Sequence, residues 1–163
     1  MTTYARRTAR VLLLDAANRL LLVRSASNPD QPERGQAWFT PGGGIEPGED
    51  PAAARELREE TGLTAASADL RLVAFTSGHA DLGWARGLFR DDFFLHRVTS
   101  HLVDVTGLTE FELRRYVGHR WWTQEDLSAT KETVYPLGLA SLVAELIAGQ
   151  IPAEPVELPW DPG

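Results

Sequence analysis

The sequence has no cysteine among its 163 residues, and this absence excludes disulfide bonds, thiolate nucleophiles and zinc–thiolate sites. Long hydrophobic runs are also lacking. No apolar stretch approaches the roughly 20 residues that a transmembrane helix needs, so we expect no membrane partner. The polar, basic segment 1–10 lacks the apolar core of a secretory signal, and a cytoplasmic location is therefore expected.

Positive charge is scarce as well: 16 Lys and Arg stand against 23 Asp and Glu, which gives a net charge of −7. No basic stripe of the kind that neutralises nucleic-acid phosphates is present, so we expect no nucleic acid polymer as a partner. An acidic protein still binds a small phosphate compound when metal ions lie between its carboxylates and the ligand. Such a site requires carboxylates clustered beside a glycine-rich turn.

The alternation of apolar and turn-forming residues predicts one mixed α/β domain over residues 1–150. Apolar runs predict strands, the first two joined by a tight turn, at 9–15, 19–24, 70–77, 92–101 and 116–123. Glycine, proline and polar residues predict irregular segments at 25–36, 38–49 and 78–89. A short helical turn and a longer amphipathic helix are predicted at 124–127 and 136–148. The tail, 151–163, holds four prolines and is predicted to be irregular.

A further helix is predicted to begin with Asp50 as its N-cap and to end at Gly62. At about 100° per residue, three of its glutamates, Glu56, Glu59 and Glu60, fall on one face. Three carboxylates beside glycines that admit a close ligand are what hard cations such as Mg²⁺ require. A solvated surface helix is the alternative interpretation of this helical stretch taken alone.

Residues 43–63 resemble the signature of the Nudix hydrolases, G-x5-E-x7-R-E-U-x-E-E-x-G-U, in which U is a bulky aliphatic residue. Gly43 and Glu49 match its first half, and residues 55–63 match every fixed position of its second half. Five residues separate the two halves, where the family has seven, and this shortening changes the helical phase by about 200°. Either the helix starts later in the family frame, or Glu46 takes over the structural role of the loop glutamate.

The resemblance implies a fold and a chemistry. The fold would be a Nudix-like α/β/α sandwich with a mixed β-sheet between helices. The reaction would be cleavage of a diphosphate bond by metal-activated water, with Mg²⁺ as cofactor and Mn²⁺ as an alternative. The implied metal ligands are Glu56, Glu59 and Glu60, helped by the carbonyl of Gly42 or Gly43.

The resemblance also implies further catalytic groups. Arg55 would orient the carboxylates by pairing with a nearby acid, and we assign catalytic roles to both Arg55 and Glu59. A glutamate outside the motif would act as general base, and we choose Glu110 over Glu112 and Glu132.

The implied substrate is a nucleoside diphosphate linked to another group, as in a nucleoside triphosphate or ADP-ribose. Trp38 and Trp84 are candidates for stacking on a base, and Arg86 for holding a phosphate, with core packing and simple solvation as their alternatives. Homodimers are common in the family, so the resemblance allows one here. A non-catalytic nucleotide-sensing module on the same fold is the alternative function, and the intact motif glutamates favour the enzyme.

Overall fold

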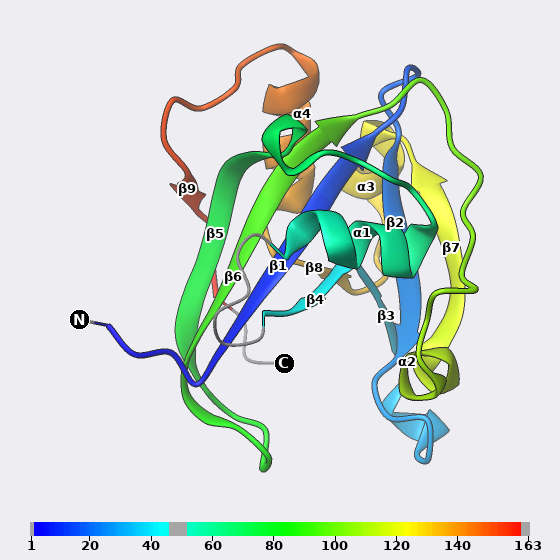
Figure 1. The fold of residues 1–163 in the computed structure, drawn as a ribbon, viewed down its shortest axis with the longest axis vertical. Coiled ribbons are helices and arrows are strands. Elements are labelled where there is room, and N and C mark those ends of the chain that lie inside the picture. Colours follow the sequence, from blue (N-terminus) through cyan, green and yellow to red (C-terminus); the bar gives the residue numbers. More distant parts are fainter. Residues whose placement is uncertain (1, 46–51, 161–163) are drawn as a thin grey trace.

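A nine-stranded mixed β-sheet organises the computed structural model, which describes residues 2–45 and 52–160 (Figure 1). The strand order is β8-β3-β2-β1-β6-β5-β9, with β4 paired to β1 and β7 paired to β2. Strand β1 runs parallel to β6 and antiparallel to β2 and β4. The strands are β1 (Arg6–Leu14), β2 (Leu20–Ala26), β3 (Gln36–Phe39), β4 (Gly42–Gly44), β5 (Arg71–Asp81), β6 (Arg86–Arg97), β7 (Tyr116–Trp122), β8 (Val134–Tyr135) and β9 (Val156–Glu157).

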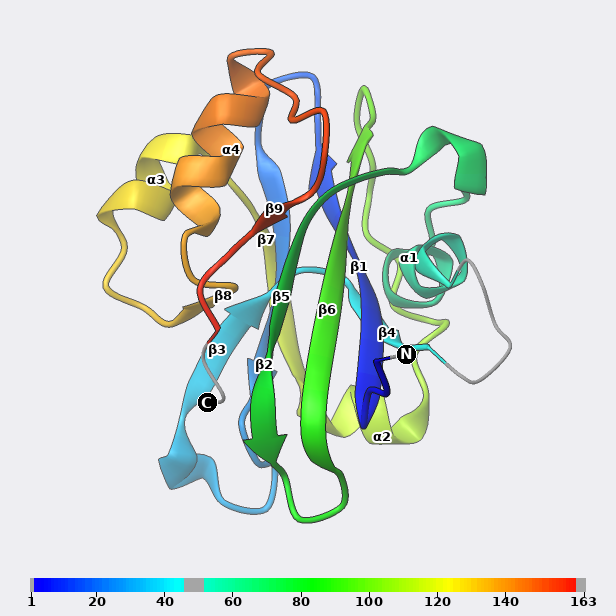
Figure 2. The ribbon, with the colours of Figure 1, turned by 90° about the vertical axis from the view of Figure 1, so that its left-hand side faces the viewer.

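Helices cover both faces of the sheet, with α1 on one side and α3 and α4 on the other (Figure 2). The arrangement confirms the predicted α/β/α sandwich. No helix in the described ranges is both long and apolar enough to cross a bilayer. The helices are α1 (Ala53–Thr61), α2 (Glu110–Arg115), α3 (Gln124–Ala129) and α4 (Leu139–Ile147), with 3-10 turns η1 (Pro32–Arg34) and η2 (Ser67–Asp69).

Two hydrophobic cores flank the sheet, and β1 contributes to both because successive strand residues point to opposite faces. Leu12 and Leu14 pack with α3 and α4, whereas Val11 and Leu13 pack with α1. All four side chains are fully buried. Each such burial stabilises the fold by about 1.5–3 kcal/mol, so β1 holds α1 firmly on the sheet.

The strands predicted from apolar runs are present, but three predicted irregular segments contain regular structure. The prediction for 38–49 is wrong at β3 and β4, because backbone pairing with β2 and β1 overrides the weak strand preference of glycine. The prediction for 78–89 is wrong because β5 and β6 continue as a long hairpin that leaves only 82–85 as its turn. The tail contains β9, paired with β5, which the prolines of 151–163 gave no reason to expect.

Helix α1 ends at Gly62, as predicted, where a φ of +77° favours glycine. The predicted start at Asp50 lies outside the described residues. Helix α2 is missing from the sequence prediction, although Thr109 and Glu112 form a complete capping box at its start.

Candidate active site

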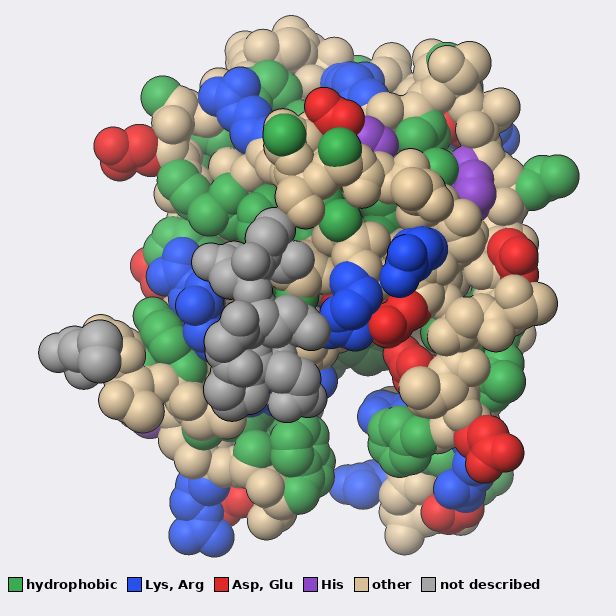
Figure 3. All heavy atoms as spheres, in the orientation of Figure 1, with side chains coloured by type: hydrophobic (Ala, Val, Ile, Leu, Met, Phe, Trp, Pro, Cys, Tyr) green, Lys and Arg blue, Asp and Glu red, His purple; other side chains and the backbone are tan. Residues whose placement is uncertain are grey.

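A cleft of about 1190 Å³ opens beside α1. It is bounded by the turn of the β5–β6 hairpin on one side and by α2 on the other, with β1, β4 and α1 between them. Figure 3 shows it as a notch at the lower centre of the molecule, with acidic side chains above it and basic side chains on its sides. The three glutamates Glu56, Glu59 and Glu60 of α1 therefore line this cleft.

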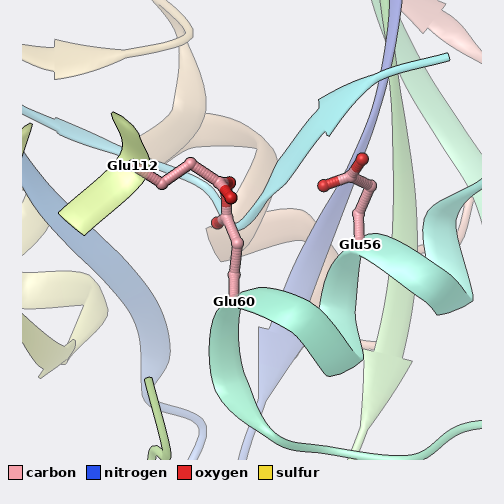
Figure 4. A group of neighbouring side chains, drawn as sticks. All are labelled: Glu56, Glu60 and Glu112. Atoms are coloured by element: carbon pink, nitrogen blue, oxygen red, sulfur yellow. The ribbon is translucent and has the colours of Figure 1, made fainter. Parts of the chain in front are cut away.

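Three carboxylates converge in the cleft from two helices (Figure 4). Glu56 and Glu60 lie one turn apart on α1, and Glu112 reaches them from α2. One carboxylate oxygen from each lies within 4.8 Å of the others. A donor set of three carboxylates without His or Cys fits a hard divalent cation such as Mg²⁺.

The glycines of β4 bring backbone against these carboxylates. The Gly42 amide donates a 3.0 Å hydrogen bond to Oε2 of Glu60. Gly42 has a φ of +154°, and a Cβ there would lie 2.4 Å from the carbonyl oxygen of Ala9. A Cβ on Gly43 would lie 2.5 Å from Oε2 of Glu56. Gly42 therefore lets the backbone of β4 approach β1 this closely, and Gly43 leaves room for the carboxylate of Glu56.

Arg55 lies between two motif glutamates. Its Nη2 donates to Oε1 of Glu56 at 2.9 Å, and its Nη1 donates to both carboxylate oxygens of Glu59, at 3.0 and 3.1 Å. The carboxylate of Glu59 lines the cleft but is outside the convergent group of three. The structure thus brings Glu56 and Glu60 together with Glu112, whereas the carboxylate of Glu59 is paired with Arg55.

Burial perturbs the acids of this site. It raises the pKa of Glu60 to about 8, against the opposing effects of Arg10 and of the Gly42 amide. Burial also raises the pKa of Glu56, and the neighbouring Arg55 offsets only part of that effect. Both shifts arise mainly from burial, which disfavours the charged form of a carboxyl group, and a divalent cation bound between the two carboxylates would oppose them.

Of the glutamates considered as general base, the structure brings Glu112 and not the chosen Glu110 to the cluster, and the base role itself stays a prediction. Glu112 is the third residue of α2, where its carboxylate accepts the backbone N–H of Thr109 at 3.0 Å. Glu110 is exposed and does not line the cleft, and Glu132 pairs with Arg24. The threonine–glutamate capping box is the sequence signal that could have distinguished Glu112.

The predicted substrate-binding residues lie in three different environments. Trp38 is 7% exposed and packs edge-on against Trp122 in the core, so the structure contradicts a stacking role for it. Trp84 is 70% exposed and lines the cleft at the turn of the hairpin. Arg86 lies outside the cleft and pairs with Asp81 at 3.0 Å, which leaves it unsuited to hold a phosphate in the site.

Comparison with known proteins agrees with this geometry. The sequence model described as NUDIX domain matches residues 4–142. Diphosphoinositol polyphosphate phosphohydrolase 2 of Rattus norvegicus is 34% identical over 112 residues, which cover 66% of this chain. The matched part is 51% of that protein, so the chain corresponds to about half the length of this relative. RNA pyrophosphohydrolase of Pseudomonas fluorescens (strain SBW25) is 33% identical over 129 residues, 69% of this chain and 79% of that protein.

Among solved structures, the NUDIX domain of Shewanella oneidensis NrtR, complexed with ADP ribose, superposes with a TM-score of 0.63. The sequence identity is 15%, and 90% of each chain is covered. This similarity concerns the fold, whereas the motif and the two sequence relatives concern the family. The chain belongs to the Nudix family.

Proposed function

We propose that this protein is a Mg²⁺-dependent pyrophosphohydrolase that cleaves a diphosphate bond in a nucleoside diphosphate linked to another group. The observation that carries the proposal is the convergence of Glu56, Glu60 and Glu112 within 4.8 Å in an open cleft. Similarity to a diphosphoinositol polyphosphate phosphohydrolase and to an RNA pyrophosphohydrolase supports the same reaction type. A purely sensory module has no need of this convergence.

Some residues of the site would bind the metal ion, and others position those metal-binding residues. Glu56 and Glu60 would supply the main metal-binding oxygens, since both are on the face of α1 that lines the cleft. The Gly42 amide and Arg55 position them, through hydrogen bonds of 3.0 and 2.9 Å. The proposed ligand role of Glu59 remains a prediction, because Arg55 engages both of its oxygens.

When bound, Mg²⁺ would neutralise the negative charge of the diphosphate and lower the pKa of a coordinated water. Glu112 faces the two α1 carboxylates from the opposite helix, and we assign it to the same donor set, where it would help to hold the ion and its coordinated water. Trp84 at the mouth of the cleft would stack on the base, a contact worth about 1–3 kcal/mol in other sites.

The test is hydrolysis of a panel of nucleoside triphosphates, dinucleoside polyphosphates and nucleoside diphosphate sugars with Mg²⁺. We expect turnover of at least one compound, and a loss of at least about 100-fold in kcat for Glu56→Gln. The matched control is Glu145→Gln, which removes an exposed carboxylate on α4, away from the cleft. Tight binding of a nucleotide without turnover by the unmodified protein would instead support a sensory module.

A further inference from the structure

The cleft holds positive charge that the carboxylate site alone does not explain. Arg6 and Arg10 from β1, Arg34 at the end of η1 and Arg115 from α2 all line it. The chain as a whole carries a net charge of −7, so this concentration of arginine departs from the composition of the protein. In Figure 3, basic side chains lie on both sides of the notch.

None of these four arginines forms an ion pair within the described part of the chain. Arg10 donates to the carbonyl oxygen of Thr40 at 3.1 Å, and Arg115 donates to the carbonyl oxygens of Ala26 and Ser27. The guanidinium carbon of Arg6 lies 5.3 Å from the ring centroid of Trp84. Neutral groups therefore position Arg6, Arg10 and Arg115, and no carboxylate of the described chain is in direct contact with their guanidinium groups.

The arginines also act on one another. Burial lowers the pKa of Arg6, and the positive charges of Arg10 and Arg115 lower it further, whereas Asp91 opposes this effect from a distance. Asp91 accepts hydrogen bonds from Thr8 and Thr76 rather than from the guanidinium. Like charges gathered in a partly buried cleft are unfavourable unless an anion lies among them.

The charge of the site indicates how large that anion is. Five arginines and four glutamates line the cleft among the described residues, an excess of one positive charge. One bound divalent cation raises the excess to three. A diphosphate diester carries about two negative charges, so it leaves part of the arginine charge without a partner. A ligand with at least one more phosphate group would neutralise it.

We propose that Arg6, Arg10 and Arg115 form a subsite for an additional phosphate, so that the preferred substrate carries at least three phosphate groups rather than a bare diphosphate. The scissile diphosphate would lie at the carboxylates, and the additional phosphate would contact the guanidinium groups. This inference rests on the proposed function, because it assigns the substrate class of the same cleft.

The test compares two substrates that differ only in phosphate number, diadenosine diphosphate and diadenosine tetraphosphate. We expect kcat/KM of the unmodified protein to favour the tetraphosphate. Arg6→Gln should lower kcat/KM for the tetraphosphate about 10- to 100-fold more than for the diphosphate, the effect of one lost charge-assisted contact. Arg115→Gln provides a second variant from the other side of the cleft, should Arg6→Gln unfold.

Arg114→Gln is the matched control, because Arg114 lies on α2 next to Arg115, pairs with the exposed Asp30 and does not line the cleft. Equal losses on the two substrates, or the same loss in the control, would overturn the subsite.

A binding measurement keeps the subsite separate from the activity. Calorimetric titration with inorganic tripolyphosphate and Mg²⁺ should give binding at least about tenfold weaker for Arg6→Gln than for Arg114→Gln. If no compound of the whole nucleotide panel is hydrolysed but this difference is found, the proposed function fails and the subsite stands. Equal tripolyphosphate affinity in the two variants overturns the subsite whatever the activity.

Discussion

Replacing Glu60 with glutamine is expected to stabilise the metal-free protein and at the same time to abolish its activity. Glutamine keeps the shape of the side chain and an oxygen that accepts the hydrogen bond of the Gly42 amide. It removes a carboxyl group whose pKa burial raises to about 8, from an ordinary value of 4.5. The two effects have opposite signs because the same charge opposes folding and binds the metal.

The magnitude follows from proton linkage. Between about pH 4.5 and 8 the carboxyl group of Glu60 is protonated in the folded state and ionised in the unfolded state. Its contribution to stability is therefore complete below pH 4.5 and is lost progressively as the pH rises to 8. The pKa difference corresponds to at most about 5 kcal/mol, and screening by water in the cleft reduces the expected loss to about 2–3 kcal/mol.

Urea unfolding in EDTA at several pH values between 5 and 9 measures this effect. The unmodified protein should lose about 2–3 kcal/mol of unfolding free energy across that range relative to Glu60→Gln, and saturating Mg²⁺ should restore it. Glu145→Gln, an exposed change on α4, should behave like the unmodified protein. A Glu60→Gln variant with an unchanged pH dependence, or with normal activity, would refute the reasoning.

Three further changes test the surroundings of the site. Glu112→Gln should lower kcat at least about 100-fold while Glu110→Gln changes it less than about threefold, because only the former reaches the cleft. Gly43→Ala should weaken Mn²⁺ binding at least about tenfold, measured by electron paramagnetic resonance, at little cost in stability. The reason is that the added methyl group would displace the carboxylate of Glu56. Thr109→Ala should lower the free energy of unfolding by about 1 kcal/mol in urea, through loss of the capping box.

The sequence predicted the parts of the fold whose signal is local and strongly periodic. The buried strand β1 follows from a continuous apolar run, helix α4 from its amphipathic pattern, and the end of α1 from Gly62. β3, β4 and the end of the β5–β6 hairpin were missed because their residues have weak strand preference and are held by backbone pairing, which for β4 is with the distant strand β1. No local pattern in a stretch such as Gly42–Gly44 can reveal a partner more than 30 residues away.

The candidate site was predictable on α1 and less so elsewhere. The helical period alone places Glu56 and Glu60 on one face, and the structure keeps them there. The third carboxylate comes from another helix, so the sequence could single out Glu112 through its capping box but could not show that α2 lies opposite α1. Trp38 shows the same limitation, because exposure decides whether an aromatic side chain stacks on a ligand or packs in the core.

The central claim is that Glu56, Glu60 and Glu112 together bind the divalent ion needed for hydrolysis, and titration with Mn²⁺ followed by electron paramagnetic resonance tests it most directly. The claim predicts that the unmodified protein and Glu145→Gln bind Mn²⁺ equally, and that Glu60→Gln and Glu112→Gln each bind it at least about tenfold more weakly. Unchanged Mn²⁺ affinity in both cleft variants would contradict it.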